Sequence, residues 1–173
     1  AWNETQVTAR QRRMDRSLHV VADGVARVEH VEWQLAWAGD VPYRVYEYQC
    51  MQVMALREST PKGAKAPRVR STVVLLGGRE APWPAWGALR TSPRGERFSG
   101  VRFRIEPVYQ YTLDALRSRR SAVWMAFAPL AVDASAEAMP AVIAELRASL
   151  SARRFEEVTV AMTVLADADT RKR

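Results

Sequence analysis

Three polar residues near the start of the chain, Asp15, Glu32 and Gln34, have side chains suited to a hard metal ion and a bound water. Mg²⁺ binds carboxylates and keeps several waters, which leaves positions in its shell for phosphate oxygens. A glutamine amide can orient a water by hydrogen bonding, although it cannot act as a base. These residues predict metal-dependent chemistry on a phosphate substrate if the fold brings them together.

The dipeptide Asp23-Gly24 provides a turn that would do so. It separates two alternating runs rich in β-branched residues, and an Asp-Gly pair in that setting is a strong hairpin signal because both turn residues adopt positive φ. Ala22 then pairs with Val25, and the same register puts Asp15 opposite Glu32. Directly paired residues project from the same face of a sheet.

The same alternation puts Gln34, His30 and His19 on the face of the two acids. Carboxylates whose Cβ atoms lie ~4.5–5.5 Å apart repel each other unless a positive group lies between them. A divalent cation is the usual group of this kind. The alternative is a pair of solvated acids on an exposed sheet face, and a register slip of one residue would separate them.

A helix is expected to follow this hairpin, over Val41–Glu58, with Asp40 as its N-cap. Arg44 and Tyr48 are four residues apart and share one face of it. Arg44 is a candidate for contact with a phosphate or a carboxylate, with a structural ion pair as the alternative, and Tyr48 is expected in the core. The apolar run Val69–Leu76 then predicts a strand that is buried on both faces and parallel to its neighbour.

The rest of the chain predicts a second hairpin and several helices. Trp86–Thr91 and Val101–Tyr109 form the hairpin, and its solvated face carries Arg102, Arg104 and Glu106. Four further segments are a short helix at 112–121, a last core strand or a buried extended segment at 122–130, a helix at 135–151, and a run at 155–166 whose type stays open between helix and strand.

This ordered series resembles the PD-(D/E)XK nuclease superfamily, in particular its branch of recombination-promoting nucleases and transposase-like proteins. The matching pieces are Asp15, His30 to Gln34, Asp40 with Arg44 and Tyr48, Ser71 to Gly78, Phe103 to Tyr111, and Ala126 to Ala131. The resemblance covers most of the chain from Asp15 to Ala131.

The resemblance implies a restriction-endonuclease-like α/β fold, a mixed β-sheet flanked by helices, and metal-dependent endonuclease activity on DNA. Asp15, Glu32 and the backbone carbonyl of Trp33 would hold Mg²⁺ or Mn²⁺, while Gln34 would orient the attacking water. His30 and Tyr48 would lie beside the site. The residues expected to contact nucleic acid are Arg44, Arg12, Arg13, Arg102 and Arg104.

Two departures from the superfamily keep a second hypothesis open. Gln34 stands where many members have lysine, although the resembling branch commonly carries glutamine as well. The superfamily usually places a helix before the first strand, whereas this sequence begins almost at that strand, which predicts either a trimmed N-terminus or an incomplete site. The second hypothesis is therefore a nuclease fold that binds nucleic acid or assembles with protein without cleavage.

Composition gives the wider setting. The 173 residues predict one domain, with 152–173 as an extension, and a net charge of +7 with an isoelectric point of about 10.2 favours a polyanionic partner such as DNA. Cys50 is the only cysteine, expected as a buried thiol, so no internal disulfide forms and a cytoplasmic location is expected. No apolar stretch is long enough for a membrane helix. A homodimer is left open.

Overall fold

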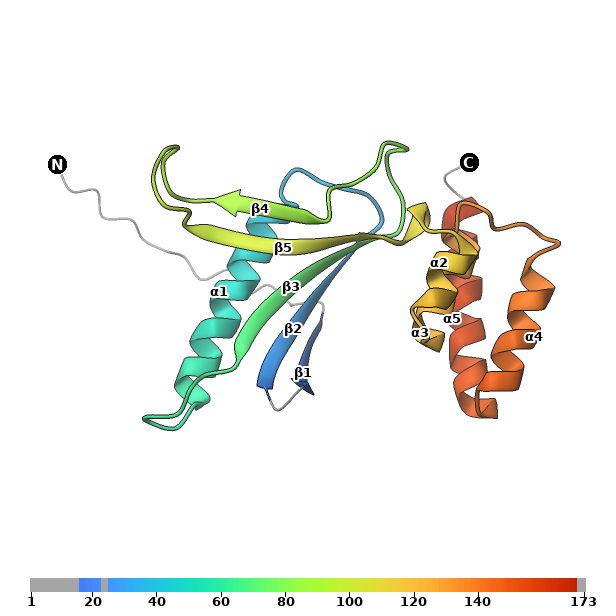
Figure 1. Ribbon diagram of the computed structural model, residues 1–173, viewed down its shortest axis with the longest axis horizontal. Coiled ribbons are helices and arrows are strands. Elements are labelled where there is room, and N and C mark those ends of the chain that lie inside the picture. Colours follow the sequence, from blue (N-terminus) through green and yellow to red (C-terminus); the bar gives the residue numbers. More distant parts are fainter. Residues whose placement is uncertain (1–15, 23–24, 171–173) are drawn as a thin grey trace.

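The computed structural model describes residues 16–22 and 25–170, which form a mixed α/β structure with a five-stranded sheet flanked by helices (Figure 1). The strand order across the sheet is β1-β2-β3-β5-β4. The strands are β1 (Arg16–Ala22), β2 (Val25–Gln34), β3 (Arg68–Leu75), β4 (Trp86–Arg90) and β5 (Gly100–Pro107). The mixed sheet with flanking helices agrees with the predicted fold class.

The hairpin of β1 and β2 has the predicted register. Ala22 pairs with Val25, and the antiparallel ladder continues to the pair Arg16 and Val31. Asp23 and Gly24, the predicted turn residues, lie outside the described residues, as does Asp15. The register predicted from the Asp-Gly signal is thus confirmed from Arg16 to Val31.

A helix crossover joins β2 to β3 and makes these two strands parallel. Helix α1 (Val41–Ser59) begins directly after Asp40 and has Pro42 in its first turn, where a missing backbone N–H is tolerated. Val41 and Val45 pack against β3 and β5 in a core cluster that also contains Val73 and Phe103. The β-β-α-β order follows the prediction, and α1 covers one face of the sheet (Figure 1).

The outer side of α1 differs from the prediction. Val53 and Met54, on the outer side of the helix, are exposed. Cys50, expected as a buried thiol, is also exposed. The helix packs on one face of a single sheet, so only the stripe with Val41, Val45, Tyr48 and Leu56 is buried.

The second hairpin, β4 with β5, is antiparallel and lies at the far edge of the sheet from β1. Val101, Phe103 and Ile105 are buried on the α1 side, which confirms the predicted alternation at these positions. Gly87 on β4 faces Phe103, and a Cβ atom at position 87 would lie 2.3 Å from the Phe103 Cε2 atom. Only glycine therefore lets β4 close over this ring without displacing it.

The C-terminal third forms a helical group at one end of the sheet (Figure 1). Its elements are the 3₁₀ turns η1 (Val108–Gln110) and η2 (Ala128–Leu130) and the helices α2 (Leu113–Ser118), α3 (Ala122–Met125), α4 (Met139–Ser149) and α5 (Ala152–Thr170). The run left open at 155–166 is helical within α5. Pro140 lies in the first turn of α4, which is why this helix begins later than the predicted residue 135.

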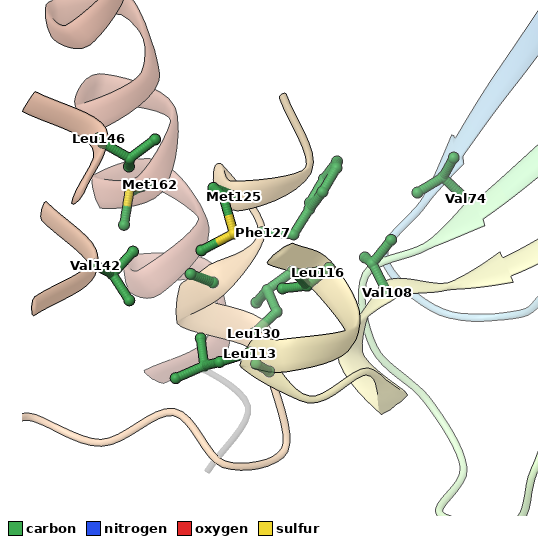
Figure 2. Close-up of a cluster of buried hydrophobic side chains, with 12 residues drawn as sticks. Val74, Val108, Leu113, Leu116, Met125, Phe127, Leu130, Val142, Leu146 and Met162 are labelled. Atoms are coloured by element: carbon green, nitrogen blue, oxygen red, sulfur yellow. The ribbon is translucent and has the colours of Figure 1, made fainter. Parts of the chain in front are cut away.

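The predicted core strand at 122–130 is wrong. This segment forms α3 and η2 and buries Met125, Phe127 and Leu130 among the neighbouring helices (Figure 2). A short apolar run has the same pattern in a buried strand and in a buried helical segment. The cluster in Figure 2 also contains Val74 on β3 and Val108 at the start of η1, so it joins the helical group to the sheet through β3. No described helix combines the length and apolar character that crossing a bilayer would require.

Candidate functional site

Glu32 lies near the end of β2 and is a buried carboxylate, with 4% of the residue exposed. It is the register partner of Val73 on β3, and Val73 packs against α1, so Glu32 points to the face that α1 covers. The alternative of a solvated acid on an exposed face is wrong for this residue. A buried carboxylate needs a cation or several hydrogen-bond donors around it.

Arg44 on α1 supplies one cation. Its Nη2 atom lies 3.2 Å from Glu32 Oε1, and its Nη1 atom lies 3.6 Å from Asp40 Oδ2. The guanidinium thus joins the start of α1 to the sheet between two carboxylates. The structure therefore brings together two residues, Arg44 and Glu32, that the sequence placed in one site.

Gln34 supplies a second donor at the same point. Its Nε2 atom donates to Glu32 Oε1 at 3.0 Å and to the backbone carbonyl of Trp33 at 2.8 Å. Glu32 Oε1 and the Trp33 carbonyl oxygen, the two atoms expected to bind a metal, therefore both point at Gln34 Nε2. Carboxylate and carbonyl oxygens converging on one electropositive group are the donor chemistry that hard cations use.

The Trp33 carbonyl has this orientation because of the strand geometry. The Leu76 backbone N–H donates to the Gln34 carbonyl at 2.9 Å, so that carbonyl points toward β3. Neighbouring carbonyls of an extended strand point to opposite sides, which turns the Trp33 carbonyl toward the β1 side. The Trp33 ring lies on the other sheet face, with its centroid 5.8 Å from that of Phe127.

His30 lies behind Glu32 and is fully buried. Its Nδ1 atom is 3.2 Å from Ser71 Oγ, whose hydroxyl donates to Gln49 Oε1 at 3.2 Å, and its Nε2 atom is 3.8 Å from Glu32 Oε2. The Tyr48 ring meets the imidazole edge-on at a centroid distance of 5.5 Å. His30 therefore lies beside the acid, and buried Tyr48 packs against the imidazole of His30. The contacts to Ser71 and Gln49 had no signal in the sequence, because they depend on how α1 packs on β3.

The other predicted residues fall into two groups, those outside the described residues and those on the opposite face of the sheet. Asp15, Arg12 and Arg13 are outside the described residues, so the structure places none of them. Arg102 and Arg104 lie on β5 and point to the sheet face opposite α1, away from Glu32. Over residues 16–22 and 25–170, no group of three or more histidine, cysteine, aspartate or glutamate side chains has a geometry that could hold a metal ion.

A second buried carboxylate was missed by the sequence analysis. Glu106, expected on a solvated strand face, is 4% exposed. It is paired with Arg104, accepts a hydrogen bond from the Tyr111 hydroxyl, and has Arg119 Nη2 at 3.6 Å. Burial, followed by the bond to Glu106, raises the pKa of Tyr111 to about 12. The available signal was that its partners Arg104, Tyr111 and Arg119 all lie close to Glu106 in the sequence.

Comparison with protein families, curated proteins and solved structures finds no match to this chain. The resemblance to the PD-(D/E)XK superfamily therefore stays a hypothesis, and the geometry around Glu32 is what bears on function.

Proposed function

We propose that this chain is a metal-dependent endonuclease that hydrolyses DNA phosphodiester bonds, with a role linked to recombination or transposition. The observation that carries the proposal is the convergence of Glu32 Oε1 and the Trp33 carbonyl on the Gln34 amide nitrogen, at 3.0 and 2.8 Å. Asp15, one residue before the described part of β1, is proposed as the second carboxylate, since the Arg16–Val31 register would set it opposite Glu32.

Each residue then has a stated role. Glu32 and the Trp33 carbonyl would hold Mg²⁺ or Mn²⁺ together with Asp15, and the ion would supply Lewis-acid polarisation of the scissile phosphate and a water of lowered pKa. Gln34 orients that water through its amide. Arg44, which lies beside the carboxylate, stabilises the negative charge that develops on the phosphate.

The arrangement of β1, β2, α1 and β3 supports this proposal. A hairpin followed by a crossover helix and a parallel strand is the order that a restriction-endonuclease-like fold requires, and the candidate residues lie at the end of β2 next to the start of α1. Sites at the ends of strands are common in α/β proteins because polar side chains can meet there outside the apolar core.

The direct test is the nicking of supercoiled plasmid in Mg²⁺ or Mn²⁺. Glu32→Gln should lower the nicking rate by at least roughly 100-fold, since even neighbours of metal ligands give losses of about 10–100-fold when replaced. Glu58→Gln, which removes an exposed acid from the last turn of α1, is the matched control and should nick at the wild-type rate. Equal nicking by wild type and Glu32→Gln would overturn the proposal.

A second candidate function is a nuclease fold that binds nucleic acid, or assembles with protein, without cleavage. The observation in its favour is that the Arg44 guanidinium already lies 3.2 Å from Glu32 Oε1 and compensates its charge. This function predicts salt-sensitive DNA binding with no nicking in either metal.

A further inference from the structure

The sheet face opposite α1 is rich in arginine. Side chains alternate along a strand, and the strand registers identify those that share this face. From β2 to β4 its described charged and aromatic residues are Arg27, Glu29, Trp33, Arg68, Arg70, Arg102, Arg104, Glu106, Trp86 and Arg90. Six arginines on this face thus stand against two glutamates, a net charge of +4.

Three of these six arginines form ion pairs with the two glutamates of the same face. Arg27 Nε lies 2.9 Å and Arg70 Nε 3.6 Å from Glu29 Oε1, and Arg104 pairs with Glu106. Arg68, Arg90 and Arg102 are all exposed, and none of these three forms an ion pair with a described residue. The excess charge therefore lies at exposed side chains, where it can meet a polyanion.

Aromatic rings lie among these arginines. Trp86 is 57% exposed and is the cross-strand partner of Arg104. The guanidinium carbons of Arg90 and Arg102 lie 5.2 and 4.8 Å from the centroid of the Phe98 ring. Flat groups held at the surface of a sheet are suited to stacking against flat ligands.

The helical group covers only one end of this face. Phe127 contacts Trp33, and Val74 joins the same cluster, so the row of Trp33, Val74 and Glu106 lies under the helices. The helical group lies beyond one end of the sheet (Figure 1). Arg68, Arg70 and Arg102 lie toward the amino ends of β3 and β5, away from the row that contacts the helices. Four neighbouring strands at a spacing of ~4.8 Å give this basic surface a width of roughly 14 Å.

We propose that this face, opposite the Glu32 site, binds single-stranded nucleic acid. The arginines would contact phosphates, while the exposed Trp86 ring would stack on bases. Stacking of this kind requires unpaired bases, because those of a duplex are covered by their neighbours. The charge of +4 argues for the polyanion, and the exposed ring argues for a single strand. This inference does not depend on metal binding or cleavage at Glu32.

The test is fluorescence anisotropy of a labelled oligo(dT) 20-mer with the full chain in EDTA, so that no metal chemistry contributes. Arg68→Gln with Arg102→Gln should weaken binding at least tenfold and reduce the slope of log affinity against log salt by about 1.4, which is 0.7 for each phosphate contact. The control, Arg57→Gln with Arg154→Gln, makes the same charge change at exposed positions on α1 and α5 and should stay within twofold of wild type.

Trp86→Leu tests the stacking contribution. It should weaken binding by about 5- to 100-fold and leave the salt slope unchanged, because no phosphate contact is lost. Circular dichroism of each variant checks that the fold is retained. The proposal is overturned if both double variants weaken binding equally, if Arg68→Gln with Arg102→Gln weakens binding of a 20-base-pair duplex as much as binding of oligo(dT), or if wild type does not bind oligo(dT).

Discussion

At the scale of single residues, the central feature is a carboxylate inside the protein. Glu32 forms an ion pair with Arg44 of α1 and accepts a hydrogen bond from the amide of Gln34 on its own strand. A charge this deeply buried stays ionised only with such partners. The same contacts that stabilise Glu32 also aim its oxygen at the point where the proposed metal would bind.

Removing the cation should therefore destabilise the protein. Arg44→Met keeps much of the side-chain volume but removes the charge next to buried Glu32, and it should lower the free energy of unfolding by about 2–3 kcal/mol. Urea denaturation followed by circular dichroism measures this change. Adding Glu32→Gln to Arg44→Met should recover part of the loss, whereas a double variant less stable than the single one would contradict the ion-pair explanation.

The raised pKa of Tyr111 predicts that the stability of the protein depends on pH. Its pKa is raised to about 12 by burial and by its bond to Glu106, whereas an unfolded tyrosine titrates near its ordinary value of 10. The neutral phenol thus contributes stability fully below pH 10, and this contribution is lost as the pH rises toward 12. Tyr111→Phe removes the charged hydrogen bond and should be less stable than wild type by ~1.5 kcal/mol at pH 8.

Urea melts of wild type and Tyr111→Phe at pH 8 and at pH 11 test this sign. The stability gap between the two proteins should narrow at pH 11, because only wild type has the phenol to lose. A gap that widens or stays constant would contradict a Tyr111 pKa raised by burial and by the contact with Glu106.

At the scale of elements, local signals explain which segments were predicted correctly. The Asp-Gly pair between alternating runs determined the β1–β2 register, and Asp40 with Pro42 marked the start of α1. Residues 122–130 carry an equally apolar pattern, but nothing in that segment shows whether helices or strands will surround it. Their helical form depends on packing against α2, α4 and α5, which lie elsewhere in the chain.

The same distinction applies to the candidate site. Glu32 and Gln34 could be placed on one face because strand alternation is a local rule. Arg44 was expected beside them only because the resemblance implied it. The burial of Glu106 and the exposure of Cys50 could not be predicted, since both depend on how much of each element the neighbouring elements cover. The roles of Glu32, Gln34 and Arg44 in catalysis stay predictions.

The β4–β5 hairpin offers a test of packing. Gly87→Ala would place a Cβ atom 2.3 Å from a ring carbon of fully buried Phe103, so the strand or the ring must move. The expected loss of unfolding free energy is about 2 kcal/mol. Gly39→Ala is the control, because nothing lies within 4 Å of its added Cβ, and it should change stability by less than about 0.5 kcal/mol. Equal effects of the two substitutions in urea melts would contradict this packing.

At the scale of the whole molecule, the two faces of the sheet carry different charged groups. One face carries the Glu32 cluster beneath α1, and the other carries the arginines of β2, β3, β4 and β5. Glu32→Gln should therefore leave oligo(dT) affinity in EDTA within twofold of wild type. Arg68→Gln with Arg102→Gln should likewise leave metal affinity unchanged. A large effect of Glu32→Gln on oligo(dT) affinity, or of the double arginine substitution on metal affinity, would show that the two faces are not independent.

The most direct test of the proposed metal site is a calorimetric titration of the full chain with Mn²⁺ in the absence of nucleic acid. Wild type and Glu58→Gln should show the same saturable binding, while Glu32→Gln should bind at least tenfold more weakly because it has lost a carboxylate ligand. Mn²⁺ binding that is absent from wild type, or unchanged in Glu32→Gln, would contradict a metal centre at the end of β2.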